Sequence, residues 1–337
     1  MELDEIPRMT FNRLVSAELE AQLSPGGVVR PLIDMGLADP RVDIQLRTAG
    51  GTSWATIYLG LTSVLDVVEG RGRFRFRAAR KHRESGRFED SWSTPTSPAA
   101  LPVDGVVEYL ARILAAGAVD ARYTRREGQV QTTISRTPNL EFGMVQREAL
   151  PSFPSNPARA AFVDRLMEPT LAALQAAPEP PNWWPGVRDG GAMPRTGLET
   201  DLIGIDSRGR LLVVEVKPSE EVKGLAWAPG QVRLYAEVFA AWASTDPAAV
   251  ASLNAMADQR SRLGLPVTSH RLAEGSPVTI APVIAAGPTP IRGLVRDRMQ
   301  RVHDQLSTRP MVFGSRIEPV EFWQFDLDGN RSDVTTL

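Results

Sequence analysis

Cysteine is absent from this chain of 337 residues. Its absence excludes disulfides, thiol nucleophiles, zinc ribbons and iron–sulfur clusters together. Any metal must therefore be held by carboxylates or by the three histidines, His82, His270 and His303. These histidines lie far apart in the sequence and show no ligand spacing, so we expect them to be ordinary surface or core residues.

Long apolar runs and a strong net charge are missing as well. No stretch approaches the roughly 18 apolar residues of a membrane span, and the acidic start Met-Glu-Leu-Asp-Glu lacks the apolar run of a signal peptide. We therefore expect a cytoplasmic protein without a membrane partner. The net charge of −2 argues against a general attraction to nucleic acid, so that any such binding must come from local basic patches.

The length and composition that remain are typical of a folded protein with two domains. The chain is 42% hydrophobic and 23% charged, and it is too long for one ordinary core. The segment PSFPSNP, residues 151–157, is the best linker, which places a first domain at 1–150 and a second at 156–337. The first is predicted to be a β-rich α+β domain with strands near 41–48, 54–59, 73–79 and 129–134 and a helix from about Asp104 to Ala116.

The second domain shows a mixed order of helices and strands. Asn156 can cap a helix that runs towards Met167, and Pro169 then kinks or restarts it. Further along, the pattern predicts helices around 229–243 and 292–306 and strands around 278–285 and 318–326. This order predicts an α/β domain in which helices cover a mixed sheet.

Two apolar strands joined by a short glycine-containing turn form the most informative segment. Their register follows from a three-residue loop, Ser207 to Gly209, in which the glycine takes the left-handed conformation. That loop places Asp201 opposite Glu215 and Glu199 opposite Lys217. A two-residue loop would instead shift every pair by one residue and scatter these charges.

Directly opposed residues point to the same face of a sheet, and so do residues two apart on one strand. The four charged side chains therefore converge at the open end of the hairpin. The three carboxylates, Asp201, Glu215 and Glu199, would repel one another unless a cation lay between them, and such hard oxygen donors suit Mg²⁺ or Mn²⁺. Lys217 beside them can hold an attacking water or neutralise charge that grows on a phosphate.

An Asp that begins one strand, followed by Glu-x-Lys at the end of the next, resembles the signature of the PD-(D/E)xK nucleases, the restriction-endonuclease-like superfamily. Here the signature reads Asp201 and then Glu215-Val216-Lys217. Gln231 and Tyr235 on the following helix resemble the Gln-x-x-x-Tyr element of the RecB-like exonucleases, and their i, i+4 spacing puts both on one helix face.

The resemblance covers roughly residues 156–326. Thr200 stands where the signature name has Pro, and the lack of cysteine excludes the iron–sulfur subgroup of the RecB-like members. The family often takes a further acidic residue from the helix before the hairpin, for which Asp164 and Glu168 are candidates. The implied fold is a restriction-endonuclease-like mixed sheet flanked by helices.

The resemblance also implies an activity, the Mg²⁺-dependent hydrolysis of DNA phosphodiester bonds in restriction, phage defence or repair. Asp201 and Glu215 would bind the metal, Lys217 would act on the water or the phosphate, and Gln231 would orient the substrate or the lysine. Two alternatives stay open: RNA as the substrate, and a catalytically silent nucleic-acid-binding or protein-interaction module on the same fold. A homodimer also stays open.

A basic run in the first domain offers one local patch for a nucleic acid. Arg73, Arg75 and Arg77 alternate with Phe74 and Phe76, so that a strand would bury the rings and present the guanidinium groups on the other face. This face is either a phosphate-tracking surface or a solvated edge strand whose arginines guard against aggregation. We assign these arginines, together with Tyr235, to substrate binding.

Two other groups of side chains have plainer interpretations. The arginines of the late helix are interpreted as a solvated face, namely Arg292, Arg296, Arg298 and Arg301. Four tryptophans could stack bases, but such residues more often pack a core, and we interpret them so: Trp183, Trp184, Trp227 and Trp242.

Overall fold

The computed structural model describes residues 6–70, 73–77, 103–115, 126–184, 199–326 and 328–337. Contacts divide the chain into two compact units, each assembled from separate segments. Unit 1 consists of Met1–Phe11, Asn139–Asn254 and Thr268–Leu337, and unit 2 of Asn12–Pro138 and Ala255–Val267.

Unit 2 is built on a four-stranded antiparallel sheet with the strand order β1-β2-β3-β4. Its elements are α1 (Ala17–Leu23), α2 (Arg30–Ala38), β1 (Val42–Ala49), β2 (Thr52–Leu59), β3 (Thr62–Gly70), β4 (Arg73–Arg77), α4 (Val103–Ala115), α5 (Arg126–Arg136) and the C-terminal part of α8 (Ala249–Arg262). Apolar side chains of the sheet pack with α1, α2 and α4 in one core. The strands predicted near 41–48, 54–59 and 73–79 and the helix predicted from Asp104 are confirmed.

The two faces of β1 differ in chemistry. Ile44 and Leu46 belong to the apolar core, whereas Asp43 and Gln45 on the opposite face are buried polar residues. Arg260 of α8 is buried as well and donates a hydrogen bond to the carbonyl oxygen of Ile44 at 3.0 Å. Such buried polar groups need partners, and this contact explains why the end of α8 belongs to unit 2.

Two predictions for the first domain differ from the structure. The strand predicted at 129–134 is part of helix α5, in which Val130 and Ile134, four residues apart, are both buried on one helix face. The domain boundary lies near Asn139 rather than at 151–157. The reason is β5 (Phe142–Ala149), which pairs with a strand of unit 1.

Unit 1 contains a six-stranded mixed sheet with the order β10-β9-β8-β7-β6-β5. The neighbours β7/β8 and β8/β9 are parallel, and the other pairs are antiparallel. Besides β5 and the start of α8, its elements are α6 (Asn156–Gln175), β6 (Thr200–Asp206), β7 (Leu211–Pro218), α7 (Val222–Thr245), β8 (Ile280–Gly287), α9 (Gly293–Ser307), the 3₁₀ helix η3 (Gly314–Arg316), β9 (Glu321–Phe325) and β10 (Arg331–Thr336). The predicted α/β domain with a mixed sheet is confirmed.

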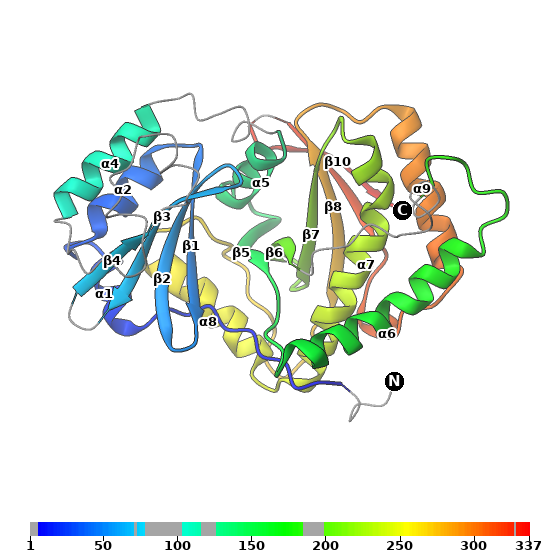
Figure 1. The fold of residues 1–337 in the computed structure, drawn as a ribbon, viewed down its shortest axis with the longest axis horizontal. Helices are drawn as coiled ribbons and strands as arrows, with labels where there is room; N and C mark the ends of the chain where they lie inside the picture. The colour runs from blue at the N-terminus through cyan, green and yellow to red at the C-terminus, as the bar shows by residue number, and fades with distance from the viewer. Residues whose placement is uncertain (1–5, 71–72, 78–102, 116–125, 185–198, 327) are drawn as a thin grey trace. The chain divides into compact units, whose positions relative to one another are not determined.

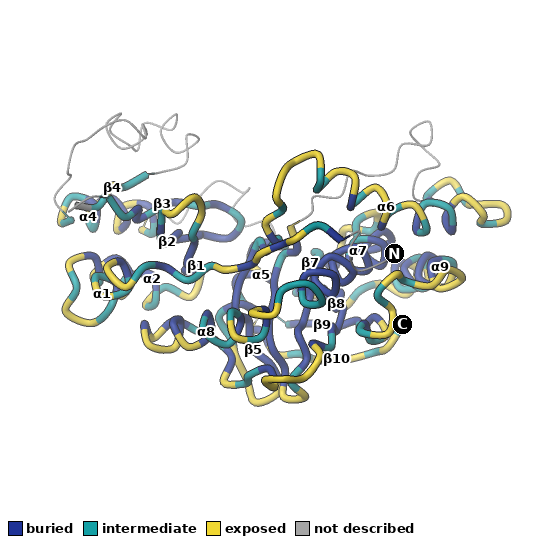
Figure 2. The backbone as a smooth tube through the Cα atoms, turned by 90° about the horizontal axis from the view of Figure 1, so that it is seen from below, coloured by how far each residue is buried: buried dark blue, intermediate teal, exposed yellow. Residues whose placement is uncertain are grey.

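Helices α6, α7 and α9 lie together beside this sheet (Figure 1). Side chains of α7 and α9 form a core with β8 and β9, and a second core joins α6, α7 and α9. Helix α7 is buried along most of its length (Figure 2), and it begins earlier than predicted because Pro229 is accommodated inside it.

Helix α6 also runs longer than predicted, and it contains Pro169. Its N-cap is Ser155 rather than Asn156, because the Ser155 hydroxyl accepts the backbone N–H of Ala158 at 3.2 Å. In the described part of the chain, no helix has both the length and the hydropathy needed to cross a lipid bilayer.

Candidate active site

The hairpin formed by β6 and β7 has the register that the turn predicts. Leu202 pairs with Val214, and Gly209 has a φ of 71°, the left-handed conformation that glycine adopts without strain. The backbone N–H of Asp206 donates to the carbonyl oxygen of Arg210 at 3.2 Å, which closes a three-residue loop. The prediction of this loop, and with it of the register, is confirmed.

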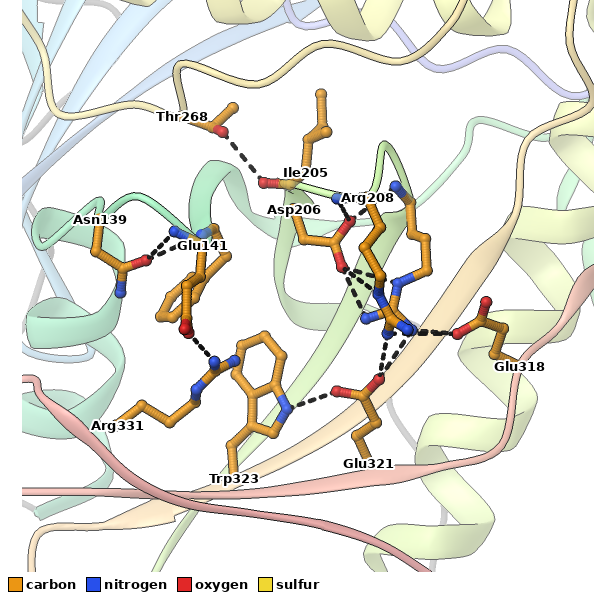
Figure 3. A network of polar contacts seen from close by, with 12 residues as sticks. Asn139, Glu141, Ile205, Asp206, Arg208, Thr268, Glu318, Glu321, Trp323 and Arg331 are labelled. Atoms are coloured by element: carbon orange, nitrogen blue, oxygen red, sulfur yellow. Dashed lines mark hydrogen bonds and ion pairs between the residues drawn. The ribbon is translucent and has the colours of Figure 1, made fainter.

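A network of buried ion pairs holds this turn in place (Figure 3). Asp206 Oδ1 accepts the backbone N–H groups of Arg208 and Arg210 at 3.1 and 2.9 Å. The Arg210 guanidinium, whose side chain is only 6% exposed, contacts Asp206 Oδ2 at 2.7 Å and Glu321 Oε1 of β9 at 2.8 Å, and it also pairs with Glu318. A slip of β6 against β7 by one residue would break the contacts of Asp206 with Arg208 and Arg210, so they oppose any other register.

The parallel pairing of β7 with β8 shows which face of the sheet carries the charged residues. Glu215 lies beside Ile284, and Lys217 lies beside Ala286. Ile284 and Ala286 pack in the core under α7 and α9. Because neighbours in register point to the same face, Glu215 and Lys217 also face these helices.

Asp201 and Glu215 meet at the open end of the hairpin. Their carboxyl groups share a hydrogen bond, and Asp201 Oδ2 accepts the backbone N–H of Val216 at 2.7 Å. Glu215 is 3% exposed, and Lys217 Nζ lies 2.5 Å from its Oε1. Burial raises the pKa of Asp201, while the Lys217 ammonium and the other contacts act in the opposite direction.

Gln231 and Tyr235 of α7 lie close to this pair. Tyr235 forms a side-chain hydrogen bond with Gln231, and burial and the nearby charges of Glu215 and Asp201 raise the pKa of its phenol. Tyr235 therefore stays protonated and can donate a hydrogen bond. Tyr235 thus lies within electrostatic reach of both carboxylates, and Gln231 is joined to the site through Tyr235.

Glu199 is exposed and precedes β6 rather than lying within it, although its charge also affects Tyr235. Asp164 and Glu168 of α6 are exposed as well. Across the described residues, no three His, Asp or Glu side chains come close enough to form a metal-binding group. The pair Asp201 and Glu215 still fits Mg²⁺, which proteins often hold through one or two carboxylates with water and substrate phosphate as the other ligands.

Arg147 is a further residue near the site that the sequence did not reveal. It lies in β5, is fully buried and pairs with Leu202, the neighbour of Asp201. Its positive charge offsets part of the rise in the pKa of Asp201 that burial causes. The next residue, Glu148, has a φ of 49°, a strained value for a residue with a side chain. The sequence gives little signal for Arg147, because it stands between the polar residues Gln146 and Glu148 in β5.

The basic strand β4 belongs to unit 2. As predicted, Phe74 and Phe76 pack against the core of that unit. Arg75 on the opposite face is exposed, and the Arg77 guanidinium lies over the ring of Trp54, 5.8 Å from its centroid. Outside the described residues lie the side chain of Arg73 and the rest of the basic run, including Arg80, Lys81, His82, Arg83 and Arg87.

Searches with protein-family models, curated proteins and solved structures found no match for this chain. What the site can do chemically is therefore inferred from its own residues. The site brings together two adjoining carboxylates, an ammonium group paired with one of them, and a protonated phenol that is hydrogen-bonded to an amide. Such a set can bind a hard cation, donate hydrogen bonds to an anion and balance the charge of both.

Proposed function

We propose that unit 1 is a metal-dependent nuclease that hydrolyses phosphodiester bonds, with DNA as its substrate and Mg²⁺ or Mn²⁺ as its cofactor. One observation carries the proposal: the Asp201–Glu215 contact, with Lys217 paired to Glu215, at the end of a hairpin whose turn fixes the register. The restriction-endonuclease-like fold is part of the same proposal.

Asp201 and Glu215 would hold the metal. In the structure their carboxyl groups share a hydrogen bond, and burial raises the pKa of Asp201, so a divalent cation would displace any proton held there on binding. The bound metal would supply an activated water and stabilise negative charge on the phosphate. The backbone N–H of Val216 holds Asp201 in place at 2.7 Å, so the carboxylate need not reorganise when the cation binds.

Lys217, Gln231 and Tyr235 would act on the substrate. With Glu215 engaged by a metal, the Lys217 ammonium can turn to a phosphate oxygen or to the attacking water, where its charge is most useful as negative charge grows. Tyr235, kept protonated by burial and by the carboxylates, can donate a hydrogen bond to the same phosphate. Gln231 orients Tyr235 through their hydrogen bond.

The test is the incubation of pure protein with labelled linear DNA, circular DNA and RNA, each with Mg²⁺, with Mn²⁺ and with EDTA. We expect DNA cleavage that requires Mg²⁺ and is lost in Glu215→Gln. The matched control is Glu274→Gln, because Glu274 is exposed and lies outside the site. If folded wild-type protein cleaves no nucleic acid with either metal, the proposal is wrong, and binding without cleavage would favour the silent module. Cleavage of RNA alone would correct the substrate.

A further inference from the structure

A second group of cationic and aromatic side chains in unit 1 lies where the end of α6 meets α9. There the surface has a cleft of about 350 Å³. One wall is apolar and consists of Ala177, Pro178, Pro180, Pro181 and Trp184, and the other wall is polar and consists of Arg301, Asp304, Gln305 and Thr308. The cleft shares no residue with the carboxylate site.

The ring of Trp183 forms cation–π contacts with two guanidinium groups of α9. The guanidinium carbons of Arg298 and Arg301 lie 5.0 and 5.6 Å from the centroid of its ring, a distance at which the ring attracts a cation. Within the described residues, neither arginine forms an ion pair. Arg296 of the same helix differs, because it pairs with Asp333 at 3.1 Å. The two arginines at Trp183 are thus held in place without an ion-pair partner in the part of the chain that the structure describes.

Two buried N–H donors in residues that contact or pack with Trp183 also lack an acceptor among the described residues. They are Nε of Arg298 and Nε1 of Trp227. Trp227 is 4% exposed and packs in the same cluster as Trp183 and Trp184. Buried polar groups are rarely left without a partner, and because both atoms are donors, the missing partner is an acceptor. The one carboxylate of the cleft, Asp304, already accepts a hydrogen bond from Gln300 at 2.9 Å.

We propose that this cleft binds a backbone phosphate of the nucleic-acid strand, away from the phosphate that reacts; the identity of the strand as a substrate rests on the proposed function. Guanidinium groups match the geometry and charge of a phosphate better than any other side chain. The apolar wall of prolines and Trp184 suits the sugar and base beside that phosphate. Arg298 and Arg301 are therefore substrate-binding residues rather than part of a solvated face.

The test measures the binding of a labelled single-stranded oligonucleotide in EDTA across a series of NaCl concentrations. Losing two phosphate contacts should reduce the slope of log affinity against log salt by about 1.4. We expect this change in Arg298→Gln/Arg301→Gln, with binding weaker by about tenfold at 0.1 M salt. The matched control, Arg159→Gln/Arg316→Gln, removes the same charge from unit 1 outside the cleft and should keep the wild-type slope.

An unchanged slope in the first double variant, or an equal fall in the control, would overturn the proposal. So would displacement of the oligonucleotide by a few millimolar inorganic phosphate beyond the effect of matched NaCl, or by a polyglutamate peptide, since either would assign the cleft to another anion. Circular dichroism checks the fold, and Arg301→Gln alone, at an exposed position, should lose about half of the slope change. Because EDTA prevents cleavage, this result is independent of the nuclease assay: cleavage with unchanged slopes refutes the cleft alone.

Discussion

Replacing Asp201 with asparagine should stabilise the metal-free protein. Asp201 accepts the N–H of Val216 at 2.7 Å and shares a hydrogen bond with Glu215, and burial raises its pKa, which favours the protonated carboxyl. Asparagine keeps an oxygen for Val216 and has an NH₂ group that donates to Glu215 without taking up a proton. The variant thus reproduces the contacts of protonated Asp201 whenever Glu215 is ionised.

The size of the effect is bounded by the repulsion between the two carboxylates when both are ionised, which the substitution removes. Two unit charges about 4 Å apart repel each other by roughly 4 kcal/mol at an effective dielectric constant near 20. Lys217 at 2.5 Å from Glu215 offsets part of this repulsion, so we expect Asp201→Asn to increase the free energy of unfolding by about 1–2 kcal/mol. In a unit of 150–250 residues this corresponds to a rise in Tm of about 2–8 °C.

The effect should also depend on pH. Because the pKa of Asp201 is raised on folding, the folded protein binds this proton more tightly than the unfolded chain does. Wild-type stability therefore falls as pH rises from about 4, the unfolded value, through the folded pKa. Asp201→Asn lacks that loss, so its advantage should widen with pH.

Thermal unfolding with EDTA and with increasing Mg²⁺ measures both parts. Wild type should gain about 2.7 kcal/mol when Mg²⁺ is at a hundredfold excess over its Kd, and the variant should gain less because it has lost a charged ligand. Asp297→Asn, at an exposed position on α9, is the control for general charge effects. If Asp201→Asn instead lowers the Tm in EDTA and Mg²⁺ shifts all three proteins equally, these carboxylates are not a metal site.

Three further predictions test other parts of unit 1. Lys217→Ala should reduce the cleavage rate by roughly 10²–10³, as the loss of one preorganised charge does in other active sites. The control Lys223→Ala, at an exposed position, should cleave at the wild-type rate. If Lys217→Ala also cleaves at the wild-type rate, Lys217 is only structural. Burial, aided by the charge of Arg233, lowers the pKa of His303, so stability should fall as pH drops below about 6.5. His303→Gln should reduce that fall in urea titrations at pH 5 and 7, and an unchanged difference would contradict the assignment. Arg210→Met leaves the carboxylates of Asp206 and Glu321 without their cationic partner. This variant should lower the free energy of unfolding by about 3–5 kcal/mol. A loss below about 1 kcal/mol in urea denaturation would show that the turn does not need the network.

The hairpin could be predicted because its determinants are local. Gly209 is the residue that takes the left-handed conformation in the turn, and the loop length then fixes every pair along β6 and β7. The apolar runs on either side of the turn predict a strand at each. Gln231 and Tyr235 followed from helical spacing alone.

The other features depended on contacts between distant parts of the chain. The alternation of Val130 and Ile134 with polar residues is compatible with a strand, but helix α5 places both side chains on one buried face. Arg147 was missed because buried arginines are rare in a strand pattern, and only the neighbouring β6 gives it a role. The hydrogen bond from Arg260 to Ile44 joins residues far apart in the sequence, which no local pattern can reveal.

The division of each unit into separate segments affects how the chain emerges from the ribosome. Strand β7 is made before α7 and α8, and its partner β8 is made only after them. The segment that completes unit 2, Ala255–Val267, precedes β8, so unit 2 is fully synthesised while the sheet of unit 1 still lacks three strands. During that interval the apolar strand β7 has one edge without its partner, and open edges of this kind pair readily with other chains. During that interval the nascent chain is therefore exposed to mispairing at the strand that carries Glu215 and Lys217.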